Sequence, residues 1–152
     1  MTTKRRFYLY IALTVLMMAL IFFQSALPAD LSQTESDLIS EFLAKIFHWD
    51  PEMASFLVRK TAHCLEYAIL GVLLTLTVGA ARGKDTFSWA LILLPWAIGT
   101  FYAVTDEFHQ HFVEGRSCEL RDMAIDLFGV LLGVCIVLII SWLRKKNHSG
   151  TA

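Results

Sequence analysis

Four long apolar segments constrain the fold of this 152-residue chain more than any other feature of its sequence. They cover approximately Phe7–Leu27, Phe56–Ala80, Phe87–Phe108 and Met123–Leu143. A helix needs roughly 20 residues, each rising about 1.5 Å, to cross a hydrocarbon layer of about 30 Å. Each segment meets that length, so the sequence predicts an all-α integral membrane protein with four transmembrane helices in a bundle.

The composition agrees with this prediction. Hydrophobic residues make up 56% of the chain and charged residues 18%, whereas a soluble domain has about a quarter of its residues charged. No internal repeat or long linker divides the sequence, so we expect a single domain over residues 1–152. The net charge is -1, and no basic helix, nucleotide-binding loop or zinc-ribbon spacing occurs, so we expect neither a nucleic-acid partner nor a cofactor or metal.

The basic residues Lys4, Arg5 and Arg6 precede the first apolar segment, which is a pattern that also opens a signal peptide. The apolar segment is longer than the usual roughly 7 to 15 residues of such a peptide. Ser25 and Ala26 do not form a clean A-x-A cleavage site. We therefore expect this segment to remain as the first membrane span.

The distribution of charge predicts the orientation. Basic residues occur at both ends of the chain and between the second and third spans: Lys4, Arg5, Arg6, Arg82, Lys84, Arg144, Lys145 and Lys146. The connection over residues 28–55 instead holds six acidic residues against the single Lys45. Basic connections remain on the cytoplasmic side. The sequence thus predicts a multi-pass protein of the cell membrane, surrounded by the lipid bilayer, with both termini cytoplasmic.

The acidic connection has a helical pattern of its own. Ser32 and Glu35 have the spacing of a capping box, which predicts a helix start there. Apolar residues then recur every four positions, at Leu38, Phe42 and Ile46. We expect an amphipathic helix lying at the outer membrane interface, and a lid folded over the bundle is the alternative.

Polar residues of the four spans gather at the outer end of the predicted bundle. The first span reaches this level at Gln24 and Ser25. On the other spans the spacing places each set along one helix face: Arg59, His63 and Glu66 on the second span, Asp106, His109 and Gln110 on the third, and Asp122 and Asp126 on the fourth. An ionised side chain that faces lipid costs several kcal/mol. The sequence therefore predicts a polar pocket that opens to the outer surface.

The glycine and tyrosine residues of the spans are interpreted as structural residues. Four glycines are expected to permit close helix contact: Gly71, Gly99, Gly129 and Gly133. Gly129 and Gly133 form a G-x-x-x-G motif, through which several copies of the chain could also associate as a homo-oligomer. Tyr67 and Tyr102 are interpreted as packing or interface aromatics.

Four ordered sequence blocks resemble the VanZ-like family, small membrane proteins named for one that confers low-level resistance to teicoplanin. The blocks are FFQSALP, RKTAHCLEYAILG, TDEFHQHFVEGRS and RDMAIDLFGVLLG, and they extend over about residues 22–133. The family pattern places its polar positions on Lys60, His63, Glu66, Asp106, Glu107, Gln110, Arg116, Asp122 and Asp126. The resemblance implies an envelope protein that acts on glycopeptide susceptibility, through surface properties or lipid-linked cell-wall intermediates.

Binding is the first of three mechanisms that the residues leave open. The cations Arg59, Lys60 and Arg116 would hold a phosphate or carboxylate of an envelope lipid. Polar neighbours would complete this ligand-binding set: Asp106, Glu107, His109, Gln110 and Asp122.

Catalysis and metal binding are the alternatives. An enzyme would use His63 or His109 as general acid or base, with a carboxylate such as Glu66 or Asp126 setting the tautomer; we assign the catalytic role to His63, Glu66 and Asp126. A metal site would use the pairs His63 with Glu66 and Asp106 with His109, each at i, i+3.

Overall fold

The computed structural model describes residues 2–83, 88–116 and 119–149, but not the side chains of residues 29–36 and 148–149. Within these ranges the chain is helical and contains no strand. The helices are α1 (Thr3–Ser25), α2 (Ala29–Phe47), α3 (Pro51–Arg82), α4 (Ala90–Gln110) and α5 (Leu120–Ser149). Lys84 and Phe87, which entered the predictions above, lie outside the described residues.

Three of the helices are long and apolar enough to cross a membrane: Thr3–Ser25, Pro51–Arg82 and Leu120–Asn147. The sequence predicts four such helices. The difference is α4, which covers most of the predicted third span but includes Asp106 and Glu107 before its end and Pro95 in its interior. These polar residues lower the mean hydropathy of the helix, so the structure supports three candidate spans by length and composition.

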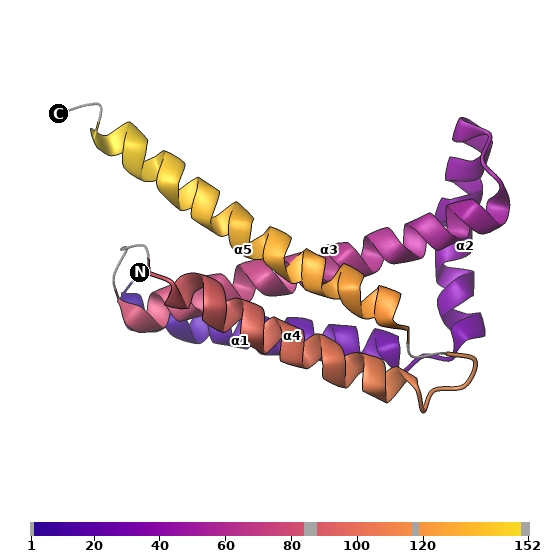
Figure 1. Cartoon of the computed structure of the whole chain (residues 1–152), viewed down its shortest axis with the longest axis horizontal. Coiled ribbons are helices and arrows are strands. Elements are labelled where there is room, and N and C mark those ends of the chain that lie inside the picture. The colour runs from indigo at the N-terminus through magenta and orange to yellow at the C-terminus, as the bar shows by residue number, and fades with distance from the viewer. Residues whose placement is uncertain (1, 84–87, 117–118, 150–152) are drawn as a thin grey trace.

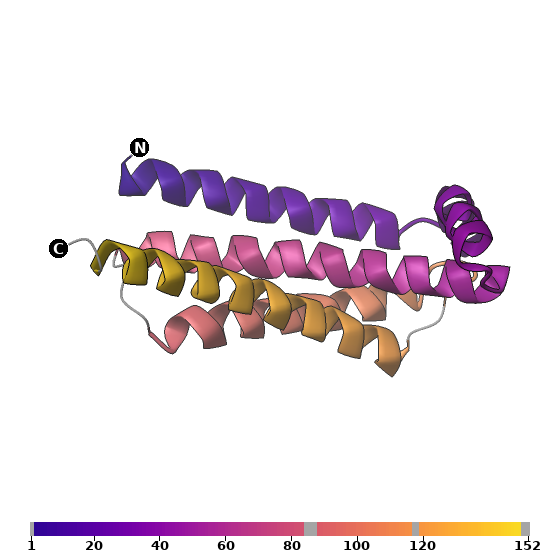
Figure 2. The same ribbon diagram turned by 90° about the horizontal axis from the view of Figure 1, so that it is seen from above.

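Helices α1, α3, α4 and α5 run lengthwise beside one another, and α2 lies across one end of them (Figure 1, Figure 2). The N- and C-terminal ends of the chain lie at the opposite end of the bundle (Figure 2). Helix α3 contacts each of the other four helices. Its buried residues Tyr67, Leu70 and Leu74 form the core together with Ile21 and Val130.

Glycines allow α3 and α5 to cross in close contact near the middle of the bundle (Figure 1). A Cβ atom added to Gly133 would lie 2.1 Å from the carbonyl oxygen of Ala68, and one added to Gly71 would lie 2.3 Å from that of Val130. A Cβ at Gly129 would lie 2.5 Å from another α3 carbonyl oxygen. The G-x-x-x-G face of α5 is therefore occupied by α3 of the same chain.

Helix α2 begins at Ala29, directly after Pro28. Ser32 thus lies inside the helix, and the helix start predicted from the capping-box spacing is wrong, because the fixed φ of Pro28 places the first turn earlier. The helix ends at His48, which has φ 53°.

The apolar stripe of α2 faces away from the bundle. Leu38 is 80% exposed and Phe42 is 63% exposed. Among the described side chains of the same helix, those of Ser40 and Ala44 are buried. A helix that keeps its apolar stripe exposed has the surface that an interfacial helix presents to lipid.

The start of α3 is defined by Asp50 and Pro51. The Asp50 side chain accepts hydrogen bonds from the backbone N–H groups of Glu52 (2.9 Å) and Met53 (3.3 Å). A capping aspartate followed by proline at the first helical position is a strong helix start. It fixes the first turns of α3, on which Ser55 and Arg59 follow.

Candidate functional site

Asp106 on α4 is the centre of a buried hydrogen-bond network. Its Oδ2 atom accepts a hydrogen bond from Ser25 of α1 (2.8 Å), from Tyr67 of α3 (3.2 Å) and from Gln110 of α4 (3.2 Å). Asp106 is 3% exposed. One carboxylate oxygen therefore joins three helices at the end of the bundle next to α2.

Arg116 closes this network from the segment that follows α4. It donates hydrogen bonds to the carbonyl oxygens of Leu27 and Gln24, both at 3.0 Å, and to Gln110 Oε1 at 3.3 Å. Burial lowers the pKa of the Arg116 guanidinium, while the charge of Asp106 raises it and that of Arg59 lowers it. A cation at the carboxyl end of a helix is favourable, so Arg116 holds the end of α1 in place.

Glu107 lies beside Asp106 on α4 and is also buried. Its Oε2 atom accepts a hydrogen bond from the backbone N–H of Glu119 at 3.0 Å. This contact ties the described residue just before α5 to the end of α4. Glu107 therefore positions the chain between the two helices.

Lys60 of α3 and Asp122 of α5 form an ion pair at the same end of the bundle. Both side chains are mostly buried, at 18% and 16% exposed. The Lys60 ammonium also lies 5.4 Å from the centre of the Phe56 ring. Because its charge is already balanced by Asp122, Lys60 is a weaker candidate for holding an external anion than the sequence suggests.

His63 and Asp126 form a second pair between α3 and α5. Asp126 is 0% exposed, and its Oδ1 atom lies 3.8 Å from Nδ1 of His63. Within the described part of the chain neither oxygen of Asp126 accepts a hydrogen bond. A buried polar group without a partner costs about 1–3 kcal/mol, so this carboxyl group is more costly to the fold than Asp106.

Arg59 borders a cavity at the start of α3. The cavity has a volume of about 490 Å³ and is lined by Glu52, Met53, Ser55, Phe56 and Arg59. Ser55 Oγ and Arg59 Nε are buried, and neither has a hydrogen-bond partner among the described residues. The two residues are four apart and so share one face of α3.

The remaining predicted residues take separate positions. Glu66, on α3, is partly buried and close enough to Asp106 and Arg116 for their charges to act on it. The ring of His109 lies against Phe22 of α1, with centroids 4.6 Å apart. In the ranges that the structure describes, no three His, Cys, Asp or Glu side chains come together in a way that could hold a metal ion.

The structure thus sorts the predicted residues into three groups. Asp106, Gln110 and Arg116 share one network, the two pairs link α3 with α5, and Arg59 faces the cavity. The predicted pocket differs from this arrangement, because the carboxylates fill the bundle end themselves and the cavity lies beside them.

Two further residues of the site were not recognised from the sequence. Tyr67 is a hydrogen-bond donor to Asp106 as well as a packing residue. Ser55 lines the cavity with Arg59. The i, i+4 spacing of Ser55 and Arg59 is a signal that could have identified Ser55.

The VanZ/LLP1 family matches the chain over residues 9–141. The chain belongs to the VanZ/LLP1 family. The match includes all five helices in part or whole and every residue of the site described above. A search of curated proteins and a search of solved structures give no match. VanZ/LLP1 membership and the apolar helices together identify a helical membrane protein, and its activity has to be argued from the site.

Proposed function

We propose that this VanZ/LLP1 protein binds the anionic group of an envelope lipid, a phosphate or a carboxylate, at the end of the bundle next to α2. The observation that carries the proposal is the cavity at the start of α3. Arg59 Nε and Ser55 Oγ are buried beside it without hydrogen-bond partners in the described part of the chain. Both are donors, so the ligand that would satisfy them is an acceptor.

The residue types around the cavity favour an anion on an amphiphile. Arginine binds carboxylate and phosphate oxygens through several N–H groups at once, and such charge-assisted bonds are about twice as strong as neutral ones. Met53 and Phe56 add apolar walls that suit the alkyl part of a lipid. The charge of Arg116 lies close enough to Arg59 for the two to interact, and Glu52 is the acidic residue among the described residues of the cavity lining.

This function requires the cavity to face the cell exterior, and we propose the matching topology. Helix α4 would cross the membrane as a fourth span beside α1, α3 and α5. The basic termini would be cytoplasmic, and α2 would lie at the outer interface with Leu38 and Phe42 toward lipid. Reporter fusions after Asp50 and after Gly83 should then report opposite sides of the membrane. The same side for both would contradict the topology.

The binding test uses purified protein and phosphatidic acid, an amphiphile with an exposed phosphate, measured by native mass spectrometry. Arg59→Gln should weaken retention about tenfold or more, because a hydrogen bond to a charged group contributes about 1.5–3 kcal/mol. Lys45→Gln is the matched control, since Lys45 is exposed on nearby α2. Equal retention by the two variants would contradict the proposal.

The proposed link to glycopeptides rests on the family resemblance and has its own test. Expression of the native chain in a Gram-positive host should reduce teicoplanin susceptibility, and Arg59→Gln should abolish the effect at equal membrane level. Protection by Arg59→Gln equal to that of the native chain would separate any resistance from the anion site.

A membrane enzyme acting on such a lipid is the second candidate, favoured by the pair of His63 and Asp126. The Nδ1 atom of His63 faces the buried carboxyl group, while 24% of the side chain is exposed. The two atoms lie 3.8 Å apart and are not hydrogen-bonded in this structure. A carboxylate that moved to hydrogen-bond distance of Nδ1 would set the tautomer that leaves the other ring nitrogen able to accept a proton. Catalysis predicts that His63→Ala abolishes turnover of the bound lipid but keeps its retention; unchanged turnover would exclude this role.

A further inference from the structure

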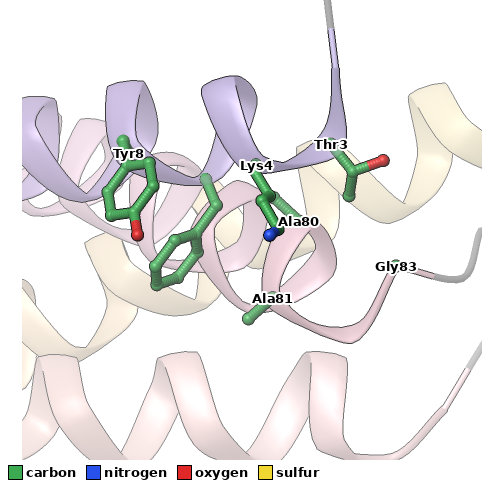
Figure 3. Close-up of a pocket in the computed structure, with 7 residues that line it drawn as sticks. Thr3, Lys4, Tyr8, Ala80, Ala81 and Gly83 are labelled. Atoms are coloured by element: carbon green, nitrogen blue, oxygen red, sulfur yellow. The ribbon is translucent and has the colours of Figure 1, made fainter.

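A second cavity lies at the other end of the bundle, where the chain begins. It is an open hollow between the first turns of α1 and the last turns of α3, with a volume of about 290 Å³ (Figure 3). Its lining consists of Thr3, Lys4, Phe7, Tyr8, Ala80, Ala81 and Gly83. Ala80, Ala81 and Gly83 have little or no side chain, so α3 leaves the space open where its last turn meets α1.

The polar part of this cavity is cationic. Lys4 points from α1 toward the end of α3 (Figure 3), and the described residues that line the cavity include no acidic residue. The first turn of α1 contains no acidic residue, and its N-cap Thr2 makes no side-chain hydrogen bond. The first N–H groups of a helix lack partners inside the helix and favour negative charge. Lys4 and these N–H groups therefore both favour a negatively charged ligand.

The charge of the surrounding surface also favours an anion. The described residues 2–10, 80–83 and 140–147 include seven basic residues and no acidic residue. These three ranges lie at the end of the bundle that carries the chain termini (Figure 2). Basic residues beside a membrane attract anionic lipids, each contributing about 1 kcal/mol.

The apolar part of the cavity suits a lipid better than a free ion. Phe7 forms a hydrophobic wall, and Tyr8, which is 67% exposed, is a residue type enriched where lipid headgroups meet the hydrocarbon layer. A volume near 300 Å³ is at the lower end for small-molecule sites. It accommodates a phosphate and its glycerol, with the acyl chains outside.

We propose that this cavity binds the phosphate headgroup of an anionic membrane phospholipid, held by Lys4 and the first turn of α1. The site is separate from the Arg59 cavity and uses a different helix end. It would anchor α1 to α3 through a lipid at the end of the bundle that lacks the Asp106 network.

The test is native mass spectrometry of the full-length protein with phosphatidylglycerol, phosphatidylcholine or inorganic phosphate added separately. In the Arg59→Gln background, which removes the other proposed anion site, the chain should retain one phosphatidylglycerol in preference to phosphatidylcholine. Lys4→Ala should weaken that retention about fivefold, and the matched control Lys145→Ala, which does not line the cavity, should leave it unchanged. Equal losses in both variants would show diffuse surface attraction and overturn the proposal.

A second variant tests the cavity independently of charge. Ala81→Trp fills the space and keeps Lys4, so it should also release phosphatidylglycerol; retention by this variant would overturn the proposal. Inorganic phosphate that binds as well as the lipid and depends on Lys4 would show a free-anion site and would overturn the assignment to a lipid. Because all variants are compared in the Arg59→Gln background, the result is distinct from lipid binding at the Arg59 cavity.

Discussion

The two ends of the bundle differ in what holds their helices together. Next to α2, the interior contains Asp106, Gln110 and Asp126, and hydrogen bonds between side chains join α1, α3 and α4. Toward the termini the helices meet through apolar side chains and the contact of Thr14 with Thr77. Ionisable groups inside a membrane protein are costly and generally functional. The costly interior next to α2 therefore supports the function proposed for that end.

The largest difference between the two ends should come from removing the network centre. Asp106→Ala leaves donors from Ser25, Tyr67 and Gln110 without their acceptor, and we expect the free energy of unfolding to fall by about 3 kcal/mol, at about 1 kcal/mol for each bond. Denaturant unfolding in micelles measures this fall in the free energy of unfolding. Asp106→Asn keeps an acceptor oxygen and should lose less; equal losses would show that the network does not hold this end.

A smaller loss is expected from Arg116→Ala. It removes the donors to Leu27, Gln24 and Gln110, which should cost about 2 kcal/mol, given the partly exposed position. Faster hydrogen exchange at the end of α1 is the specific readout. The exposed Arg121→Ala is the control, and similar exchange in the two variants would contradict the anchoring of α1 by Arg116.

Asp126 should behave in the opposite way from Asp106. Its oxygens have no hydrogen-bond partner in the described part of the chain, so Asp126→Leu removes a desolvated polar group and should raise the free energy of unfolding by about 1 kcal/mol. The same unfolding measurement applies, with Asp106→Leu as the matched control. A loss in both variants would mean that Asp126 stabilises the fold, which would contradict the cost assigned to its buried carboxyl group.

The smallest effect belongs to the end that carries the termini. Thr77→Ala removes the contact with Thr14 (3.1 Å), and hydrogen bonds between membrane helices contribute about 0.6 kcal/mol on average. A change of that size in the free energy of unfolding would confirm that this end depends less on hydrogen bonds than the end next to α2. A loss as large as that of Asp106→Ala would remove the contrast.

The sequence predicted part of this fold because hydropathy and charge act locally. Three apolar segments correspond to α1, α3 and α5 with ends within a few residues. The third predicted span corresponds to α4, which is not among the three candidate spans. It has the length of a span but carries Asp106 and Glu107. The start of α2 was missed because Pro28 sets it, not Ser32.

The site was predictable only as a set of residues on helix faces. Spacing placed Arg59 and His63 on one face of α3, but spacing within a helix does not reveal partners on other helices. The hydrogen bond from Tyr67 to Asp106 and the binding of Arg116 to the end of α1 depend on how the helices cross. The use of Gly129 and Gly133 inside the chain, which leaves that face closed to another copy, depends on the same crossing.

The close contact at Gly71, Gly129 and Gly133 also restricts motion. Backbone atoms of α3 and α5 touch without side chains between them, so we expect these two helices to move as one rigid body. Arg59, His63 and Asp126 belong to that body. Helices α1 and α4 are joined to each other through Ser25 and Asp106, and the hydrogen bond from Tyr67 joins them to this body. A ligand that moves α1 and α4 against the fixed α3–α5 frame would therefore have to break the hydrogen bond between Tyr67 and Asp106.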